Sequence, residues 1–163
     1  MQRQQWITLL SIPVFLCALV VQPALAETRY RAVVLDNGLL KVGSFTVRLY
    51  GIAITPSARI CQTWVRPARC GSRAVLALER RVDRFVRCDY VARGNGGTRV
   101  GFCRVKDDRD ILGPEVDLGA WMIYQGWAVA LPEAPFEYHT LERIARNSNR
   151  GVWGFQVDSV TFR

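Results

Sequence analysis

The chain is poor in several features on which common enzyme classes depend. It contains a single histidine, His139, in 163 residues, and only two of its 22 basic residues are lysine. His139 has no serine or cysteine in a catalytic motif as a partner, so we expect a surface or half-buried side chain and no general base. The sequence also contains no internal repeat and no low-complexity tract, which disfavours repeat architectures and extended disordered segments.

Long apolar runs are also missing, apart from one at the start of the chain. Residues 7–21 form an apolar run that is too short for a comfortable membrane span. The run ends in Pro23-Ala24-Leu25-Ala26, a small-x-small cleavage signal, and Arg3 is the only charged residue before it. We therefore expect residues 1–26 to be a cleaved signal peptide, with an uncleaved anchor as the alternative.

Acidic residues are outnumbered by basic ones. The chain has 14 Asp+Glu against 22 Lys+Arg, for a formal net charge of +8. After loss of Arg3, residues 27–163 would carry about +7, and their length fits a single domain with one core. A basic exported domain favours polyanions such as nucleic acid, anionic lipid or acidic polysaccharide, and charge alone does not choose among them. The abundance of arginine suits phosphate and carboxylate groups, which its planar guanidinium binds well.

Four of the five cysteines lie in the expected mature domain. An even number of cysteines in an exported chain favours disulfides, and four allow three pairings. We favour Cys61–Cys70, which would close a short loop before a helix, and Cys88–Cys103, which would join neighbouring strands. A zinc site built from all four thiolates is the competing hypothesis, but the close C-x₂-C pairs that zinc usually requires are missing.

The order of turn residues and apolar spacings indicates a small, mainly β domain. Alternating or β-branched segments bounded by turn residues predict strands at 29–35, 39–42, 45–50, 87–92 and 99–105. Apolar residues at helical spacing predict helices at 72–86, 117–125 and 137–149. Three closely spaced strands at the start of a small domain predict a meander or a barrel.

The segment 47–57, V-R-L-Y-G-I-A-I-T-P-S, resembles the central motif of the staphylococcal-nuclease-like (thermonuclease) family, V-R-L-x-G-I-D-x-P-E. Further family motifs follow in order: Cys70-Gly71 before a helix, Gly126-Trp127-Ala128, and a Y-x₃-E-x₂-A pattern from Tyr138 that leads to Gly-Val-Trp at 151–153. Together they cover nearly all of the mature domain. The resemblance implies an α+β, mainly β fold, with a five-stranded OB-type barrel and about three helices.

The resemblance also implies a chemistry, and the chain departs from it. Active members of the family cleave phosphodiester bonds of DNA and RNA with calcium, which prefers several carboxylate ligands. The family's three calcium-binding carboxylates fall on Gly38, Ala53 and Ser57. None of these residues can supply a carboxylate. We therefore expect no resident cofactor and no calcium-dependent hydrolysis.

The family's arginines are better preserved. Arg48 matches the first phosphate-binding arginine of the family, and the second aligns with Thr98, one residue before Arg99. A slip of one residue along a strand turns a side chain to the other face. Arg99 therefore takes the second role only if the glycine-rich turn at 94–97 absorbs the slip.

Three functions remain open at this point. The favoured one is a periplasmic or extracellular module that binds nucleic acid or another polyanion, without nuclease activity or a stable membrane anchor. The second is a divergent calcium-dependent nuclease, whose ligands would come from elsewhere, for example from the acidic residues Asp107, Asp108, Asp110 and Glu115. The third is an accessory protein of exopolysaccharide production, because secreted relatives of this type resemble such proteins. The sequence sets no expectation for the oligomeric state.

Overall fold

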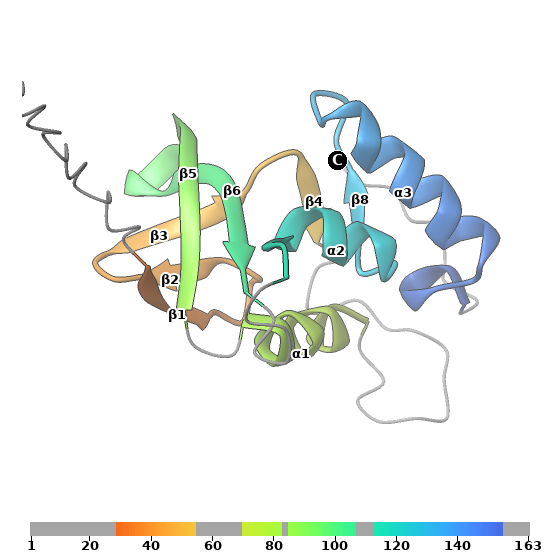
Figure 1. Cartoon of the computed structure of the whole chain (residues 1–163), viewed down its shortest axis with the longest axis horizontal. Helices are drawn as coiled ribbons and strands as arrows, with labels where there is room; N and C mark the ends of the chain where they lie inside the picture. Colours follow the sequence, from red (N-terminus) through yellow and green to blue (C-terminus); the bar gives the residue numbers. More distant parts are fainter. Residues whose placement is uncertain (1–28, 55–69, 83–84, 107–112, 155–163) are drawn as a thin grey trace, which may run out of the picture.

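The computed structural model describes residues 29–54, 70–82, 85–106 and 113–154 (Figure 1). Within them, five strands close into a barrel in the order β1-β2-β3-β6-β5 and back to β1. All neighbours pair antiparallel except β3 and β6, which pair parallel and close the barrel. The strands are β1 (Tyr30–Val34), β2 (Leu40–Val42), β3 (Phe45–Leu49), β5 (Phe85–Arg93) and β6 (Arg99–Val105). The expected α+β, mainly β fold with an OB-type barrel is confirmed.

The first three strands form the predicted meander. Their burial alternates, with every second residue of β1 and β2 facing the core, as a strand with one solvated face requires. The turn between β1 and β2 ends at Gly38, which has a φ of +78°. Glycine adopts this left-handed conformation without the steric cost that other residues bear.

The described part of the chain has three α-helices: α1 (Cys70–Val82), α2 (Leu118–Tyr124) and α3 (Phe136–Asn147). The first two pack on the barrel, and α3 packs on α2 and on β8 (Ala128–Ala130). Figure 1 shows the barrel at one end of the molecule and α3 at the other, with α2 between them. The Asp117 carboxylate caps α2 by accepting hydrogen bonds from the backbone N–H groups of Gly119 (2.8 Å) and Ala120 (3.1 Å). None of the described helices is long and apolar enough to cross a membrane.

The boundary between α1 and β5 differs from the prediction. The expected helix at 72–86 ends at Val82, and Phe85 and Val86 belong to β5, where Val86 is fully buried and pairs with Tyr30. Val82 and Phe85 are three residues apart, a spacing that fits a helical stripe as well as a helix followed by a strand. The long-range pairing with β1 decides between the two.

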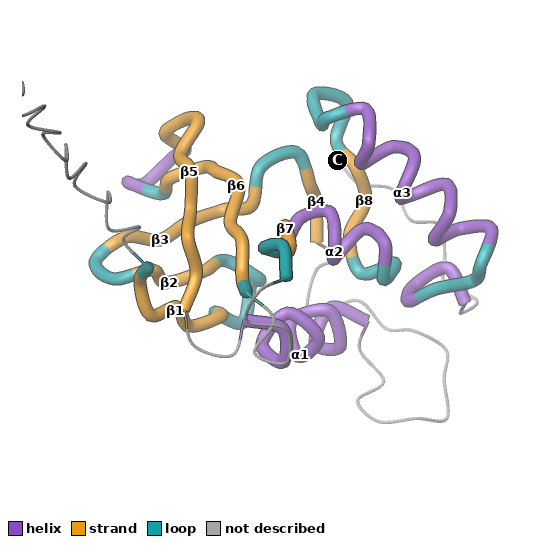
Figure 2. The backbone as a smooth tube through the Cα atoms, in the orientation of Figure 1, coloured by secondary structure: helices purple, strands orange, loops and turns teal. Residues whose placement is uncertain are grey.

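Short elements connect the barrel to α3. The strands β4 (Ile52–Ile54) and β8 (Ala128–Ala130) form a separate two-stranded sheet, which lies beside α3 in Figure 2. The strand β7 (Val116–Asp117) extends the main sheet from β6. Two 3₁₀ turns complete the described structure, η1 (Asn95–Gly97) and η2 (Gly151–Gly154).

One continuous apolar core joins the barrel to α1 and α2. Its largest fully buried side chains include Leu40 from β2, Leu78 from α1, and Met122 from α2. A buried carboxylate, that of Glu142 on α3, accepts hydrogen bonds from the backbone N–H of Ala130 (2.8 Å) and from Nε of Arg146 (2.9 Å). The bond from Ala130 fixes α3 against β8, and the bond from Arg146, also on α3, balances the buried carboxylate.

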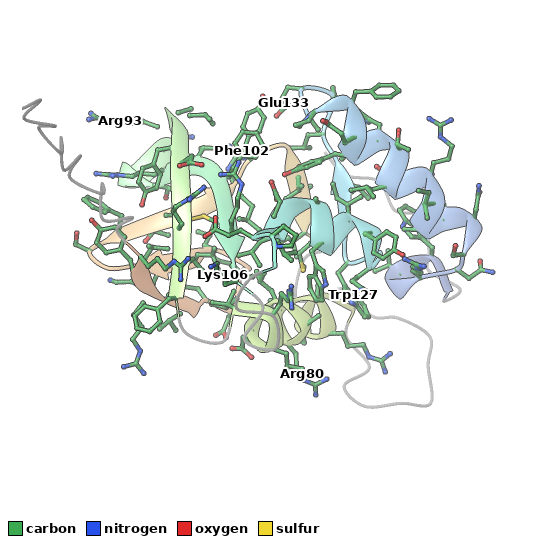
Figure 3. The ribbon with its side chains drawn as sticks, viewed as in Figure 1. Arg80, Arg93, Phe102, Lys106, Trp127 and Glu133 are labelled. Atoms are coloured by element: carbon green, nitrogen blue, oxygen red, sulfur yellow. A yellow bond between two sulfur atoms is a disulfide. The ribbon has the colours of Figure 1, made fainter. Side chains whose placement is uncertain are left out.

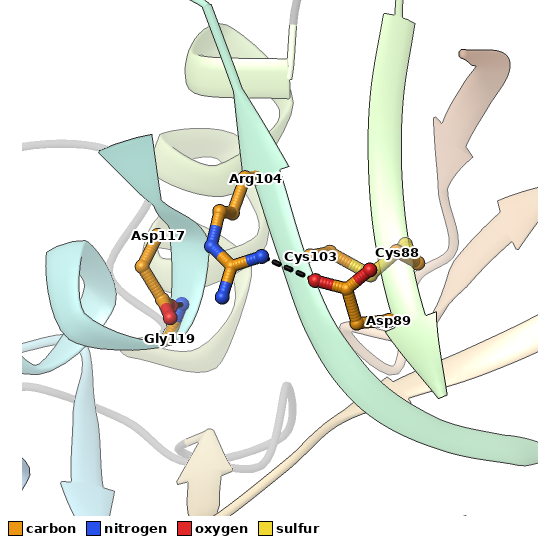
Figure 4. Close-up of a disulfide and its surroundings, with 6 residues drawn as sticks. All are labelled: Cys88, Asp89, Cys103, Arg104, Asp117 and Gly119. Atoms are coloured by element: carbon orange, nitrogen blue, oxygen red, sulfur yellow. Dashed lines mark hydrogen bonds and ion pairs between the residues drawn. A yellow bond between two sulfur atoms is a disulfide. The ribbon is translucent and has the colours of Figure 1, made fainter. Parts of the chain in front are cut away.

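A disulfide joins the two longest strands of the barrel. Cys88 on β5 and Cys103 on β6 face each other in the strand register and are bonded (Figure 4), which confirms that expected pairing. A disulfide fits an oxidising compartment. The expected Cys61–Cys70 pairing stays a prediction, because Cys61 lies outside the described residues. The expected signal peptide at 1–26 lies outside them too.

Candidate anion-binding site

An apolar side chain lies close to Gly38, the position expected for the first calcium carboxylate. A Cβ built on Gly38 would lie 2.8 Å from Cδ1 of Ile54, closer than real carbon contacts allow. Ile54 reaches this position from β4, and Ala53 beside it is half-buried in the pairing with β8. A carboxylate at position 38 would therefore require Ile54 to move. Ser57 lies outside the described residues.

The acidic cluster that could have supplied a relocated cation site is described only at Glu115. Its carboxylate forms salt bridges with Arg29 (3.3 Å) and Arg87 (3.2 Å), so its charge is balanced by arginines. The cluster's three aspartates lie outside the described residues. Across the described ranges, no three acidic, histidine or cysteine side chains gather in a group that could hold a metal ion. The described residues therefore do not fit a calcium site.

The strand register places the two predicted phosphate-binding arginines on different faces. In the parallel pair of β3 and β6, Arg48 lies opposite Val100, and Val47 lies opposite Arg99. Successive side chains of a strand point to opposite faces, so Arg99 shares the face of Val47, which is fully buried in the core. Arg48 is exposed on the outer face. The structure thus does not bring Arg48 and Arg99 together.

Arg99 instead takes part in an aromatic stack at one end of the barrel. The central carbon of its guanidinium lies 3.3 Å from the ring centroid of Phe45 and 4.7 Å from that of Tyr90. Both rings remain partly open to solvent, with exposed fractions of 40% and 38%. A cation over an aromatic face is held by the ring quadrupole. Arg99 is therefore positioned by two rings on neighbouring strands.

A pocket opens beside this stack, at the end of the barrel where β6 begins and β5 ends. Its volume is about 350 Å³, and we call it the mouth pocket; its lining residues are Tyr90, Val91, Ala92, Arg93 and Arg99. The register shifts between Tyr90 and Ala92, as at a β-bulge, which re-aims side chains. Arg93 and Arg99 face each other across the two strands. The lining thus contains two cations and no acidic group.

Sequence reasoning did not single out Phe45, Tyr90 or Arg93. The signal that could have found them is the strand alternation. Phe45 is two residues before Val47 on β3, and Tyr90 pairs with Gly101, two residues after Arg99 on β6. Phe45, Tyr90 and Arg99 therefore share one face by the period of two. Arg93 joins them opposite Arg99 because the register shifts between Tyr90 and Ala92. The parallel pairing of β3 with β6, which a sequence does not reveal, was needed to bring these residues together.

The aromatic and acidic side chains near the outer face of the barrel bind one another. The ring of Phe102 packs against Tyr50, with centroids 4.9 Å apart, and Tyr138 lies beyond it at 6.5 Å. The Tyr138 hydroxyl donates to the Asp117 carboxylate at 2.9 Å. Burial, and then the nearby Asp117 charge, raise the pKa of Tyr138 well above its usual range. These groups support α2 and α3 against the barrel.

The polar side chains next to these groups are also paired with one another. The Arg104 guanidinium forms a salt bridge with the Asp89 carboxylate across β5 and β6, and Figure 4 shows Arg104 between Asp89 and Asp117. Both carboxylates therefore have partners of their own. They lie outside the lining of the mouth pocket, so they do not cancel the charge of its arginines by direct contact.

Comparison of the sequence with protein-family models finds no match, and comparison with curated proteins finds none either. The candidate site therefore rests on the geometry of this chain alone. That geometry offers exposed guanidinium groups and aromatic rings, which can bind an anion, and no carboxylate cluster among the described residues that could bind calcium.

Proposed function

We propose that the protein is an exported staphylococcal-nuclease-like domain that binds polyanions and does not hydrolyse them with calcium. The observation that carries the proposal is the apolar surrounding of Gly38, where a built Cβ would lie 2.8 Å from Cδ1 of Ile54 and no carboxylate is present. The OB-type barrel supports it, because such barrels bind oligonucleotides and oligosaccharides. The disulfide between Cys88 and Cys103 supports export.

Binding a polyanion and hydrolysing it place different demands on the site. A metal ion in a phosphodiesterase polarises the phosphate and is worth several kcal/mol of the barrier, and each 1.4 kcal/mol is about a factor of ten in rate. Arg48 provides charge for a phosphate group but no means of activating water. A chain that retains the arginine and has lost the carboxylates keeps the electrostatic attraction and loses the hydrolysis.

The experiment is an assay of binding and cleavage on the same samples. The oxidised protein is incubated with single- and double-stranded DNA and RNA, with calcium or with a chelator. We expect binding that survives the chelator and no cleavage with calcium. Cleavage that requires calcium and is lost in Arg48→Ala would contradict the proposal and support a divergent nuclease.

Acidic polysaccharide is a second polyanion class that the same charge would attract. The salt dependence of binding does not separate it from nucleic acid, because both release counterions. Direct competition between a labelled oligonucleotide and an unlabelled acidic polysaccharide separates them. Preference for the polysaccharide would favour the role in exopolysaccharide production.

A further inference from the structure

The mouth pocket is distinct from the surface around Arg48. Arg48 is exposed on the outer face of β3, whereas Arg99 shares the inward face with Val47. Figure 3 places Arg93, the second cation of the pocket, at the tip of β5, on the side of the barrel away from α3. The resemblance to the nuclease family places its second arginine at Thr98, one residue before Arg99, and assigns no role to Tyr90 or Arg93.

The pocket combines two kinds of recognition chemistry within a few residues. Arg93 and Arg99 provide guanidinium groups from facing positions on adjacent strands, where directly opposed side chains lie close together. Tyr90 provides an aromatic ring that is partly open to solvent even though it holds Arg99. Phe45 lies outside the lining and holds Arg99 as well. Guanidinium groups bind phosphate through charge-assisted hydrogen bonds, and open rings stack on planar groups.

The stack also fixes one of the two cations before a ligand arrives. An arginine side chain carries about 2 kcal/mol of rotamer entropy, and loss of such freedom on binding weakens affinity. Arg99 is held between the rings of Phe45 and Tyr90 in the protein as it stands. The ordering of this side chain therefore precedes binding.

We propose that the mouth pocket binds one nucleotide unit of single-stranded nucleic acid, with the phosphate on Arg93 and Arg99 and the base against Tyr90. This inference rests on the proposed function, because it assumes that the protein binds polyanions. The pocket volume of about 350 Å³ lies at the small end of the range for ligand pockets, which suits one nucleotide better than a longer segment. A duplex would not fit in this way, since its bases are stacked inside the helix.

Two features favour nucleic acid over an acidic polysaccharide. The exposed ring of Tyr90 offers a flat face, and every base has a π-face that stacks on it whatever the sequence. The polar part of the lining consists of cations and one phenol, and lacks the carboxylates and amides that would accept hydrogen bonds from sugar hydroxyls.

The test uses two ligands with the same number of phosphates. Labelled ten-residue oligothymidylate and an abasic ten-residue strand are titrated with the oxidised protein, and dissociation constants are measured by fluorescence anisotropy. We expect oligothymidylate to bind roughly tenfold more tightly, as for one stacked base. Tyr90→Leu should remove this difference while both ligands still bind.

Two arginine variants with the same loss of charge complete the test. Arg93→Gln removes a guanidinium of the pocket, and Arg143→Gln removes an exposed one from α3, at the other end of the molecule. We expect Arg93→Gln to weaken both strands several-fold more than Arg143→Gln does. Arg93 is exposed, so this comparison remains decisive if Tyr90→Leu does not fold, as judged by circular dichroism.

The outcomes separate the pocket from the function on which it rests. Equal affinity of the wild type for the two strands, or equal effects of Arg93→Gln and Arg143→Gln, overturns the proposed pocket while polyanion binding stands. Displacement of oligothymidylate by polygalacturonate at lower concentration than by unlabelled oligothymidylate also overturns it, in favour of an acidic polysaccharide. Failure of the wild type to bind any of these polyanions overturns both proposals.

Discussion

At the scale of single residues, Gly38 and Gly96 share a left-handed backbone conformation but differ in their surroundings. Their φ angles are +78° and +64°, and a Cβ would meet Ile54 at 2.8 Å in the first case and no atom within 4 Å in the second. We expect Gly38→Ala and Gly96→Ala each to lose about 1 kcal/mol of the free energy of unfolding through backbone strain. Gly38→Ala should lose a further ~0.5–1.5 kcal/mol, because the terminal methyl group of Ile54 must turn out of its preferred position.

Denaturation in urea measures both losses, and a third variant identifies the cause. Ile54→Ala removes the atom that the new Cβ would meet, so Gly38→Ala should be less costly in that background than in the wild type. The two substitutions are then coupled, as expected for residues in contact. Equal losses for Gly38→Ala and Gly96→Ala would show that Ile54 does not fill the position of the missing carboxylate.

Tyr138 gives a prediction on pH. Burial beside Asp117 raises the pKa of its hydroxyl in the folded state, so the folded protein holds the phenol proton more tightly than the unfolded chain. The stability from this difference is present below the ordinary tyrosine pKa near 10 and is lost as the pH rises above it, by up to about 1.4 kcal/mol per pH unit. Tyr138→Phe lacks this loss.

The measurement compares the free energy of unfolding of the wild type and Tyr138→Phe between pH 7 and 11. At neutral pH the wild type should be more stable by about 1 kcal/mol, because the variant loses the hydrogen bond to Asp117. The difference should shrink or reverse above pH 10. Tyr30→Phe, which removes an exposed hydroxyl, is the matched control, and a pH-independent difference for Tyr138→Phe would contradict the prediction.

At the scale of elements, the pair β5 and β6 carries the disulfide and the mouth pocket together. Cys88 and Cys103 are 15 residues apart in sequence, and closing a loop of this length removes about 3 kcal/mol of unfolded-state entropy in the chain-entropy description. We expect the double substitution Cys88→Ala and Cys103→Ala to lower the free energy of unfolding by ~2–4 kcal/mol. Chemical denaturation without reductant measures it, so that other cysteine pairs are unaffected.

The stability loss of the double alanine variant has two sources, the missing covalent bond and the missing side-chain volume. Cys103 is fully buried, so its truncation also leaves a small cavity. The variant Cys88→Ala with Cys103→Val fills that space and isolates the effect of the covalent bond. If this variant is as stable as the wild type, packing and not the cross-link holds the two strands together.

The elements also show how far sequence reasoning reaches. The meander of β1 to β3 was predicted because turn residues and alternation are local signals. The end of α1 was not, because the spacing of Val82 and Phe85 fits both a helix and a strand, and only the pairing of β5 with β1 resolves it. The sheet of β4 and β8 joins segments more than 70 residues apart, and no local pattern specifies such a contact.

The candidate site also has a part that the sequence predicts and a part that depends on long-range strand pairing. The absence of carboxylates at Gly38 and Ala53 is readable from the sequence, since it depends on residue identity alone. The face on which Arg99 lies is not readable from the sequence, because a slip of one residue depends on the register of β6 against β3. The stack with Phe45 and Tyr90 depends on that same register.

At the scale of the whole molecule, the basic charge should govern how binding responds to salt. The chain carries a formal net charge of +8, and each phosphate contact releases counterions from a nucleic acid. The logarithm of the association constant should therefore fall linearly with the logarithm of the salt concentration. For single strands the slope is about −0.7 per phosphate contact.

The salt dependence of binding also tests whether Arg48 contacts a phosphate group. If Arg48 contacts a phosphate, Arg48→Gln should reduce the steepness of the salt dependence by about 0.7, since one contact is lost. Arg143→Gln lowers the net charge equally from an exposed site on α3, and should leave the slope nearly unchanged. Fluorescence anisotropy titrations at several salt concentrations measure both slopes. Equal slopes for the two variants would mean that Arg48 acts only through the net charge and does not contact the ligand.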